Sequence, residues 1–431
     1  MPKVLLSTAL LSVTGSLWFL PLTAEDAAMF RGSLAHTGVY DAPGVPKLPS
    51  VKWKFQTGGR IISSPAVVNG TVYVGSADGN LYAIDSANGS LKWKFATNGM
   101  VTSSPAVSAG IVCFGSFDGS FYAVNAATGQ QVWRFDTEGE RRFAAKNIHG
   151  IQPEGEIMPD FWDFYLSSPA VSDGSVYFGS GDGDVYALDV SSGLVKWKFK
   201  TGNVVHASPA IANGTLFIGS FDGSFYALDT VTGKEKWRHK TGEDNVIHNQ
   251  EGITSSAAVV DGVVYVGCRD SHLYFLDVET GQRIWEMFAG GGWVTNSPAV
   301  KDGKVYSGGG SDRQFHALNA KSGAHVFSLD VEGGTFASPA IAGNFLYLAT
   351  FDNKIRAIDL TTNTLTWKFE LNAKPADRAE TASPLKPLPF YDDRVASMAK
   401  KLQSGVFLSS PVVVGNTIYI GNTDGAVYAL Q

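Results

Sequence analysis

A repeated element constrains the fold of this chain more than any other feature. Each copy begins with Ser-Ser-Pro-Ala or a close variant, and eight copies can be counted. Their proline positions are Pro65, Pro105, Pro169, Pro209, Pro298, Pro339 and Pro411, with Ala257 in the proline place of the fifth copy. Consecutive copies lie 40, 64, 40, 48, 41, 41 and 72 residues apart. A recurrent period of about 40 residues is typical of repeat architectures, so the three long steps indicate insertions.

Each copy contains four short stretches that read as β-strands. The first follows the Ser-Pro-Ala start, the second is of the type Val72–Gly75, and the third is of the type Leu81–Asp85. The fourth carries a tryptophan, except that the sixth copy has Phe327 in its place and the eighth copy ends before this strand. Pairs such as Asp78-Gly79 supply the positive φ that a tight hairpin turn needs. Roughly 40 residues with four strands is the size of one propeller blade. The sequence therefore predicts an all-β fold, an eight-bladed β-propeller of four-stranded antiparallel blades.

The two ends of the repeated region predict how the ring closes. The eighth copy stops at Leu430-Gln431, before its tryptophan strand, whereas an extra tryptophan strand, Val51–Phe55, precedes the first copy. We predict that this N-terminal strand completes the last blade, with Trp53 beside Val427–Leu430. Such closure removes two sheet edges that would otherwise be open to aggregation.

The recurring tryptophan is predicted to pack between adjacent blades. A buried indole removes on the order of 200 Å² from water, which corresponds to roughly 5 kcal/mol before entropy is counted. A carbohydrate-binding stripe is the alternative, and we consider it less favoured. The structural set is Trp53, Trp93, Trp133, Trp197, Trp237, Trp285 and Trp367.

The chain divides into an export signal, a lead segment and the propeller. Residues 1–24 combine Lys3 with an apolar stretch and a small residue, Ala24, at the expected cleavage point, which predicts a signal peptide. A transmembrane anchor is the alternative, but the run is short and contains several Ser and Thr residues. The segments are 1–24, 25–50 and 51–431, with insertions at about 138–166, 242–253 and 371–408. We expect a periplasmic or secreted monomer with no membrane span in the mature chain.

Charge and cysteine content exclude some partners and cross-links. The formal net charge is −6 and no run of Lys or Arg is present. A nucleic-acid partner needs clustered basic residues, so none is expected. The two cysteines, Cys113 and Cys268, fall in different copies and at different repeat positions. In a ring of blades their Cα atoms cannot come within the roughly 7 Å that a disulfide needs. We predict two buried free thiols.

All three insertions are predicted to project from one end of the ring. In an up-and-down blade, the loop between the second and third strands and the loop to the next blade lie at the same end. We call the end that carries the Asp-Gly turns and the insertions the insertion-bearing face. Long loops in a compact repeat usually serve a function.

Departures from the repeat indicate candidate binding residues on this face. His206 stands where the first copy has Ile62, and the fifth copy has Arg269-Asp270-Ser271-His272 in place of the Asp-Gly turn. Together with polar residues of the insertions, the candidate ligand-binding set is Arg142, His149, His206, His248, Asn249, Arg269, Asp270 and His272. Such a set suits an anionic or metal-bearing ligand. The alternative is that these side chains bond to the insertions and hold them in place.

No catalytic residue and no metal site is predicted. The sequence has no His-x-His or His-x3-His spacing and no haem-attachment motif. Nothing marks a nucleophile, and the recurring Ser64-Pro65 type is structural. No phosphate-binding glycine loop occurs in a strand–helix context.

The repeat Tyr-Ala-Leu-Asp-x3-Gly-x3-Trp-x-Phe, as in Tyr186–Phe199, resembles the pyrroloquinoline-quinone (PQQ)-type repeat. The resemblance covers residues 51–431 and implies an eight-bladed scaffold shared by two families. Quinoprotein dehydrogenases hold the quinone and a calcium ion on the propeller axis, whereas assembly factors of the BamB type bind no quinone and act as periplasmic scaffolds. This chain lacks the adjacent Cys-Cys pair of the former and the lipid-attachment cysteine of the latter.

We therefore expect an exported propeller that binds a protein or small-molecule ligand through the insertion-bearing face, without catalysis and without a cofactor. The alternative is a PQQ-dependent periplasmic dehydrogenase, with calcium, that oxidises alcohols, sugars or aldehydes.

Overall fold

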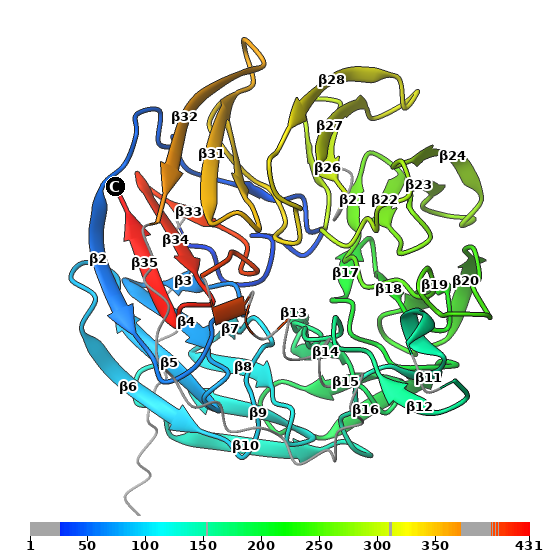
Figure 1. Ribbon diagram of the computed structural model, residues 1–431. Coiled ribbons are helices and arrows are strands. Elements are labelled where there is room, and N and C mark those ends of the chain that lie inside the picture. Colours follow the sequence, from blue (N-terminus) through cyan, green and yellow to red (C-terminus); the bar gives the residue numbers. More distant parts are fainter. Residues whose placement is uncertain are drawn as a thin grey trace, which may run out of the picture.

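The computed structural model describes residues 26–151, 154–309, 313–371 and 405–431, together with Met398, Lys400, Leu402 and Gln403. The predicted signal peptide, residues 1–24, and most of the third predicted insertion, residues 371–408, lie outside this described part. Within it, no helix is long and apolar enough to cross a membrane. The described chain forms a ring of eight antiparallel sheets around a central channel, as predicted (Figure 1).

The first four blades each hold four consecutive strands, and the innermost strand comes first. Blade 1 contains β3 (Ala66–Val68), β4 (Thr71–Gly75), β5 (Asn80–Asp85) and β6 (Leu91–Ala96). Blade 2 contains β7 (Ala106–Ser108), β8 (Ile111–Gly115), β9 (Ser120–Asn125) and β10 (Gln131–Asp136). Blade 3 contains β13 (Ala170–Ser172), β14 (Ser175–Gly179), β15 (Asp184–Asp189) and β16 (Val195–Lys200). Blade 4 contains β17 (Ala210–Ala212), β18 (Thr215–Gly219), β19 (Ser224–Asp229) and β20 (Glu235–Lys240).

The next three blades repeat this order and the eighth closes the ring. Blade 5 contains β21 (Ala258–Val260), β22 (Val263–Gly267), β23 (His272–Asp277) and β24 (Arg283–Phe288). Blade 6 contains β25 (Ala299–Lys301), β26 (Lys304–Gly308), β27 (Gln314–Asn319) and β28 (His325–Asp330). Blade 7 contains β29 (Ala340–Ala342), β30 (Phe345–Ala349), β31 (Lys354–Asp359) and β32 (Thr364–Glu370). Blade 8 contains β33 (Val412–Val414), β34 (Thr417–Gly421), β35 (Ala426–Leu430) and the N-terminal β2 (Val51–Gln56).

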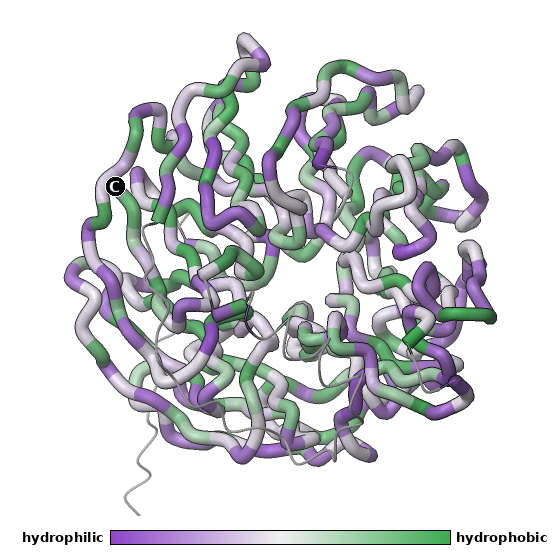
Figure 2. Tube along the Cα trace, in the orientation of Figure 1, coloured by the Kyte–Doolittle hydropathy of each residue, from purple (hydrophilic) through white to green (hydrophobic). Residues whose placement is uncertain are grey.

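Ring closure follows the prediction residue by residue. Strand β2 pairs antiparallel with β35, and Trp53 lies opposite Ala429. The burial pattern of β2 fits the outermost position in a blade. The second strand of a blade, such as β4, has buried side chains on both of its sides, whereas exposed and more buried side chains are mixed along β2. Hydrophilic and hydrophobic residues alternate accordingly along the outer strands (Figure 2).

Five of the blades are joined to the next blade through a tryptophan. The indole Nε1 of Trp237 donates to the backbone oxygen of Val278 in the following blade, at 3.0 Å. The glycine of the Asp-x3-Gly turn lies against the indole of the preceding blade, and a Cβ on Gly281 would overlap Trp237. Equivalent indole hydrogen bonds to the following blade are made by Trp53, Trp93, Trp133 and Trp197. Trp367 Nε1 donates instead to the backbone oxygen of Val45 in the lead segment, at 2.9 Å. In the described part of the chain, Trp285 Nε1 has no such partner.

A closed ring of serines links the eight inner strands around the channel. The backbone N–H of each of these serines donates to the Oγ of the serine in the next blade, and Ser410 N–H returns to Ser64 Oγ at 2.9 Å. The ring consists of Ser64, Ser104, Ser168, Ser208, Ser256, Ser297, Ser338 and Ser410. The serine directly before the proline place of each repeat start therefore accepts from a buried backbone donor in the neighbouring blade.

The lead segment has a role that the sequence did not indicate. Its backbone oxygens accept hydrogen bonds from the inner strands of six blades, at Val67, Val107, Ile211, Val259, Val300 and Ile341. Strand β1 (Val39–Tyr40) also pairs in parallel with β29, so blade 7 has five strands instead of the four expected. Inside this segment Arg31 is almost completely buried and donates to the backbone oxygens of Pro298, at 2.8 Å, and Pro339. Residues 26–45 therefore bridge the inner strands at one end of the channel.

Candidate functional site

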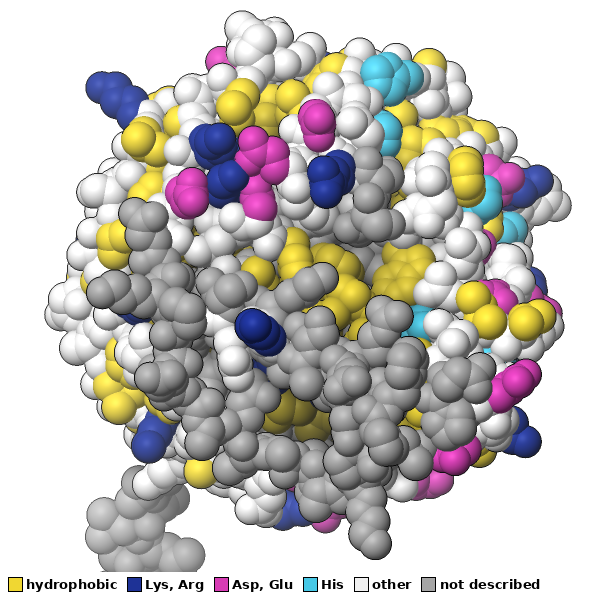
Figure 3. All heavy atoms as spheres, viewed as in Figure 1, with side chains coloured by type: hydrophobic (Ala, Val, Ile, Leu, Met, Phe, Trp, Pro, Cys, Tyr) yellow, Lys and Arg dark blue, Asp and Glu magenta, His cyan; other side chains and the backbone are white. Residues whose placement is uncertain are grey.

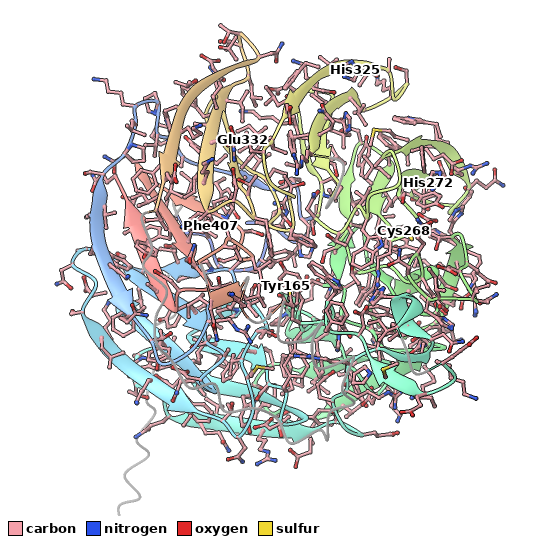
Figure 4. All side chains as sticks on the ribbon, in the orientation of Figure 1. Tyr165, Cys268, His272, His325, Glu332 and Phe407 are labelled. Atoms are coloured by element: carbon pink, nitrogen blue, oxygen red, sulfur yellow. The ribbon has the colours of Figure 1, made fainter. Side chains whose placement is uncertain are left out.

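The first insertion folds over the channel at the insertion-bearing face. It contains the hairpin of β11 (Ala144–Lys146) and β12 (Ile157–Pro159), with the 3-10 turn η1 (Ile148–Gly150) between them. After β12, residues 160–166 run across the channel mouth to blade 3. Tyr165 of this stretch lies at the centre of the ring (Figure 4) and donates its hydroxyl hydrogen to the backbone oxygen of Leu408 at 3.0 Å. Burial of the hydroxyl raises the pKa of Tyr165 well above its usual range.

His206, at the start of blade 4, is held between two carboxylates of the first insertion. Its Nδ1 lies 2.6 Å from Asp163 Oδ1 and its Nε2 lies 2.8 Å from Glu140 Oε1. Burial, the largest influence, lowers the pKa of His206, but the attraction and hydrogen bonds of the two carboxylates outweigh it and raise the pKa to about 10. His206 is therefore a buried cation at neutral pH that fastens the insertion to the propeller.

Arg269, in the turn between β22 and β23, is fastened to the same insertion. Its Nη1 donates to Asp160 Oδ2 at 2.6 Å. His149 Nε2 lies 2.9 Å from the other oxygen of Asp160, and His149 Nδ1 lies 2.9 Å from Asn249 Oδ1 of the second insertion. Burial acts to raise the pKa of Asp160, but the charges of Arg269 and His149 hold it well below the usual range. One network thus joins blade 5 and both insertions.

Four of the eight predicted site residues come together in these two clusters, namely His149, His206, Asn249 and Arg269. The other four lie elsewhere. Arg142 stacks over the ring of Phe117 at 5.8 Å, and His248 pairs with Glu251 inside the second insertion.

Asp270 and His272 complete that second group. Asp270 accepts from Gly242 N–H and Tyr274 O–H, as Asp78 accepts from Gly58 N–H and Tyr82 O–H in blade 1. His272 bonds to the backbone oxygen of Asp270, and Figure 4 places it farther from the centre of the ring than Tyr165.

An aromatic-walled cavity lies beside the two ion-pair clusters. Its lining residues surround about 390 Å³ of space, a volume that includes open solvent at the mouth. Its lining residues are Trp162, Asp163, Phe164, Tyr165, His206, Thr254, Arg269, Trp293, Thr295 and Phe336. Trp162 stacks on Phe336 with ring centroids 5.3 Å apart. Hydrophobic side chains are visible in the central hollow of the molecular surface (Figure 3). We call this space the Arg269 cavity.

A second cavity continues along the axis below Tyr165. The serine ring and Phe30 of the lead segment line it. The residue two places before each ring serine also lines it: these are Ile62, Thr102, Leu166, His206, Thr254, Thr295, Phe336 and Leu408. Sequence reasoning selected His206 at this register but missed Thr102, Thr254 and Thr295, which the same comparison between copies would have found.

The acidic residues at this mouth do not fit a calcium ion. Both oxygens of Asp160 and of Asp163 accept hydrogen bonds from protein groups, and Glu140 is paired with His206. Calcium needs several oxygen ligands that are free to bind it. Among the described residues, no group of three or more His, Cys, Asp or Glu is arranged to hold a metal. Cys113 and Cys268 are buried free thiols, as predicted, so they supply no disulfide next to a ligand.

Comparisons with known proteins agree with the ring and its repeats. A BamB from Moraxella catarrhalis has a TM-score of 0.64 at 17% identity, covering 89% of this chain and 98% of that one. A europium-containing methanol dehydrogenase has a TM-score of 0.71 at 14% identity, covering 95% and 98%. A quinohemoprotein alcohol dehydrogenase from Comamonas testosteroni has a TM-score of 0.71 at 15% identity, covering 94% and 80%. At these identities the likeness concerns the fold. A comparison with curated proteins gave no match.

The family assignment comes from the sequence itself. The model of the family described as "Outer membrane protein assembly factor BamB" matches residues 47–152, 159–292 and 269–431, so it spans nearly the whole propeller. This chain therefore belongs to the family of the outer membrane protein assembly factor BamB.

Proposed function

We propose that this protein is an exported binding scaffold that takes a protein partner or a small ligand at its insertion-bearing face and has no catalysis of its own. The family description names an assembly factor of the outer membrane, which supports a location outside the cytoplasm and a protein partner. The predicted signal peptide supports the same location.

One observation carries the proposal: the charged groups of this face are used to hold the insertions in a fixed shape. His206 bridges Glu140 and Asp163, while Arg269 and His149 share Asp160. Both ring nitrogens of His206 and both oxygens of Asp160 and of Asp163 are already bonded to protein groups, so these atoms have no free position for proton transfer with a ligand. What they provide is a rigid surface on top of the ring, which is the property a binding scaffold needs.

The two described insertions also expose apolar side chains. The side chain of Ile157 is 68% exposed and that of Val246 is 74% exposed. The backbone N–H of His149 donates to the oxygen of Ile247 at 2.6 Å, so the two insertions form one joined surface. Exposed apolar residues on functional loops are a common feature of interaction sites.

Site-specific photo-crosslinking in cells tests this proposal. A photoreactive amino acid replaces Ile157 or Val246 on the insertion-bearing face, and Leu194 or Val231 in turns at the opposite end of the ring serves as the matched control. The control residues are comparably exposed, at 71% and 82%. We expect a discrete crosslinked partner from the first pair alone. Crosslinks from the opposite end only, or equally from both ends, would refute the choice of face.

The PQQ-dependent dehydrogenase remains the second candidate because two of the similar folds are alcohol or methanol dehydrogenases. An absorbance spectrum of the purified protein, with and without added quinone and calcium, separates the two functions. We expect no bound chromophore and no dye reduction with alcohols, sugars or aldehydes. Substrate-dependent dye reduction would replace the scaffold proposal by an oxidoreductase.

A further inference from the structure

We infer that the Arg269 cavity binds the carboxylate of an apolar ligand, either a small acid or the C-terminal end of a peptide. This inference deepens the proposed function, because it names the ligand class of one site on the insertion-bearing face. It follows from four buried hydrogen-bond donors that have no partner in the described structure.

The first two donors belong to Arg269. Its side chain is 2% exposed, and Nη1 is used by Asp160. Within the described part of the chain, its Nε and Nη2 atoms are buried and have no hydrogen-bond partner. These two atoms form one edge of the guanidinium, where two N–H bonds point in the same direction. That spacing matches the two oxygens of a carboxylate.

The guanidinium lies over two aromatic rings. Its central carbon lies 4.2 Å from the ring centroid of Trp293 and 5.5 Å from that of Phe221. Cation–π contacts of this kind fix the plane of an arginine. The ion pair with Asp160 fixes its orientation within that plane. The free edge is therefore set before any ligand arrives, which reduces the ordering cost of binding.

The other two donors are the hydroxyls of Thr254 and Thr295, which line the same cavity. Among described residues, neither Oγ1 atom has a hydrogen-bond partner although both are buried. Leaving a buried donor unpaired is costly, so native proteins seldom do it without a ligand or bound water.

The carboxylate of the cavity wall has no free oxygen left to accept a hydrogen bond from a ligand. Both oxygens of Asp163 are occupied, Oδ1 by His206 and Oδ2 by the backbone N–H of Phe143 at 2.7 Å. A sugar or an alcohol needs acceptors for its own hydroxyl hydrogens, whereas a carboxylate offers oxygens only. The threonine hydroxyls can donate or accept, but the free edge of Arg269 can only donate, so this edge selects a group that offers acceptors only.

The remaining wall describes the rest of the ligand. Trp162, Trp293 and Phe336 line the cavity, and the ring centroids of Trp162 and Trp293 are 5.8 Å apart. An apolar or aromatic group would bury its surface against them. A carboxylate attached to such a group fits both parts of the site.

Binding of four probes to the purified protein tests the inference by titration calorimetry. The probes are 3-phenylpropionate, its uncharged amide, a tripeptide ending in phenylalanine, and the same tripeptide with an amidated end. We expect one or both carboxylates to bind with a Kd on the order of 1 mM or tighter, and each amide at least tenfold more weakly. Preference for the peptide acid identifies a chain end as the ligand, and preference for the free acid identifies a small molecule.

Three variants locate the binding. Arg269→Lys keeps the positive charge but loses the two-donor edge, and Thr295→Val removes a hydroxyl without touching any ion pair. Thr102→Val is the matched control, because its Oγ1 is equally buried and unpaired in the described structure but it lies outside the Arg269 cavity. We expect about tenfold and about fivefold weaker binding for the first two and no change for the control.

Equal binding of acids and amides, absence of binding by both acids, or insensitivity to both Arg269→Lys and Thr295→Val would overturn the inference. These outcomes leave the crosslinking result untouched, so a partner captured by the insertions would preserve the proposed function without this ligand class.

Discussion

Removing the positive charge of His206 is expected to release the first insertion from the ring. We consider His206→Gln, which is similar in size but neutral. It leaves Glu140 and Asp163 buried without the cation between them. Breaking a buried ion pair by removing one partner typically costs about 3 to 5 kcal/mol.

The pKa of His206 gives a second, independent value for the free energy that the ion pair contributes to holding the insertion closed. Its folded value of about 10 lies above the ordinary 6.5, so protonation favours the closed insertion. The stabilisation is complete below pH 6.5 and declines by about 1.4 kcal/mol per pH unit as the pH rises towards 10. About 4 kcal/mol therefore remains at pH 7. Above pH 10 the contribution is lost.

Hydrogen exchange followed by mass spectrometry measures this opening directly. In His206→Gln at pH 7, we expect amides of residues 138–166 to lose protection by two to three orders of magnitude, which is the equivalent of about 4 kcal/mol. Peptides of blades 1 and 8 should change little. His325→Gln is the matched control, because His325 is exposed and bonds only to Ser328 among the described residues. Unchanged protection of residues 138–166 in the variant would refute the role assigned to this ion pair.

Three further predictions concern the ring. Trp237→Phe removes an indole hydrogen bond between two blades, whereas Trp285→Phe removes an Nε1 that has no partner in the described structure. In urea denaturation, Trp237→Phe should therefore lower the free energy of unfolding by about 1 kcal/mol more than Trp285→Phe. Equal losses in the two variants would contradict this. Burial lowers the pKa of His36 in the lead segment to about 3. The neutral imidazole therefore contributes its full stability above pH 6.5, and this contribution falls as the pH drops towards 3. In a plot of melting temperature against pH, His36→Asn should make the decrease below pH 6.5 less steep. Gly233→Ala would place a Cβ 2.6 Å from the indole of Trp197 and should lower the free energy of unfolding by about 2 to 4 kcal/mol. Gly262→Ala is the control, because Gly262 has a similar positive φ but open space around it, and it should cost about 1 kcal/mol. A similar loss in both variants would show that backbone strain, and not the contact with the indole, is the cause.

Comparison of the eight copies predicted the ring, its closure and the face that carries the insertions. These are properties of local pattern: each blade repeats the same strand lengths and turns, and the strand of Trp53 is complementary to the only incomplete blade. The same comparison selected His206, which stands where the first copy has Ile62, and Arg269, which stands where the fourth copy has Phe221. A charged residue at either position cannot make the apolar contacts that the repeat makes there.

The sequence alone therefore determined the propeller, since its information recurs every 40 residues or so and is read locally. Only the tertiary structure decided what the unique residues do, because their partners lie far away along the chain. Arg269 meets Asp160 across 109 residues and Arg31 meets Pro339 across 308. No spacing rule connects such pairs, and an insertion or a lead segment occurs once, so no second copy reveals its path. The bridging of the channel by residues 26–45 and the donor-lined Arg269 cavity are consequences of folding the unrepeated segments onto the repeated ones.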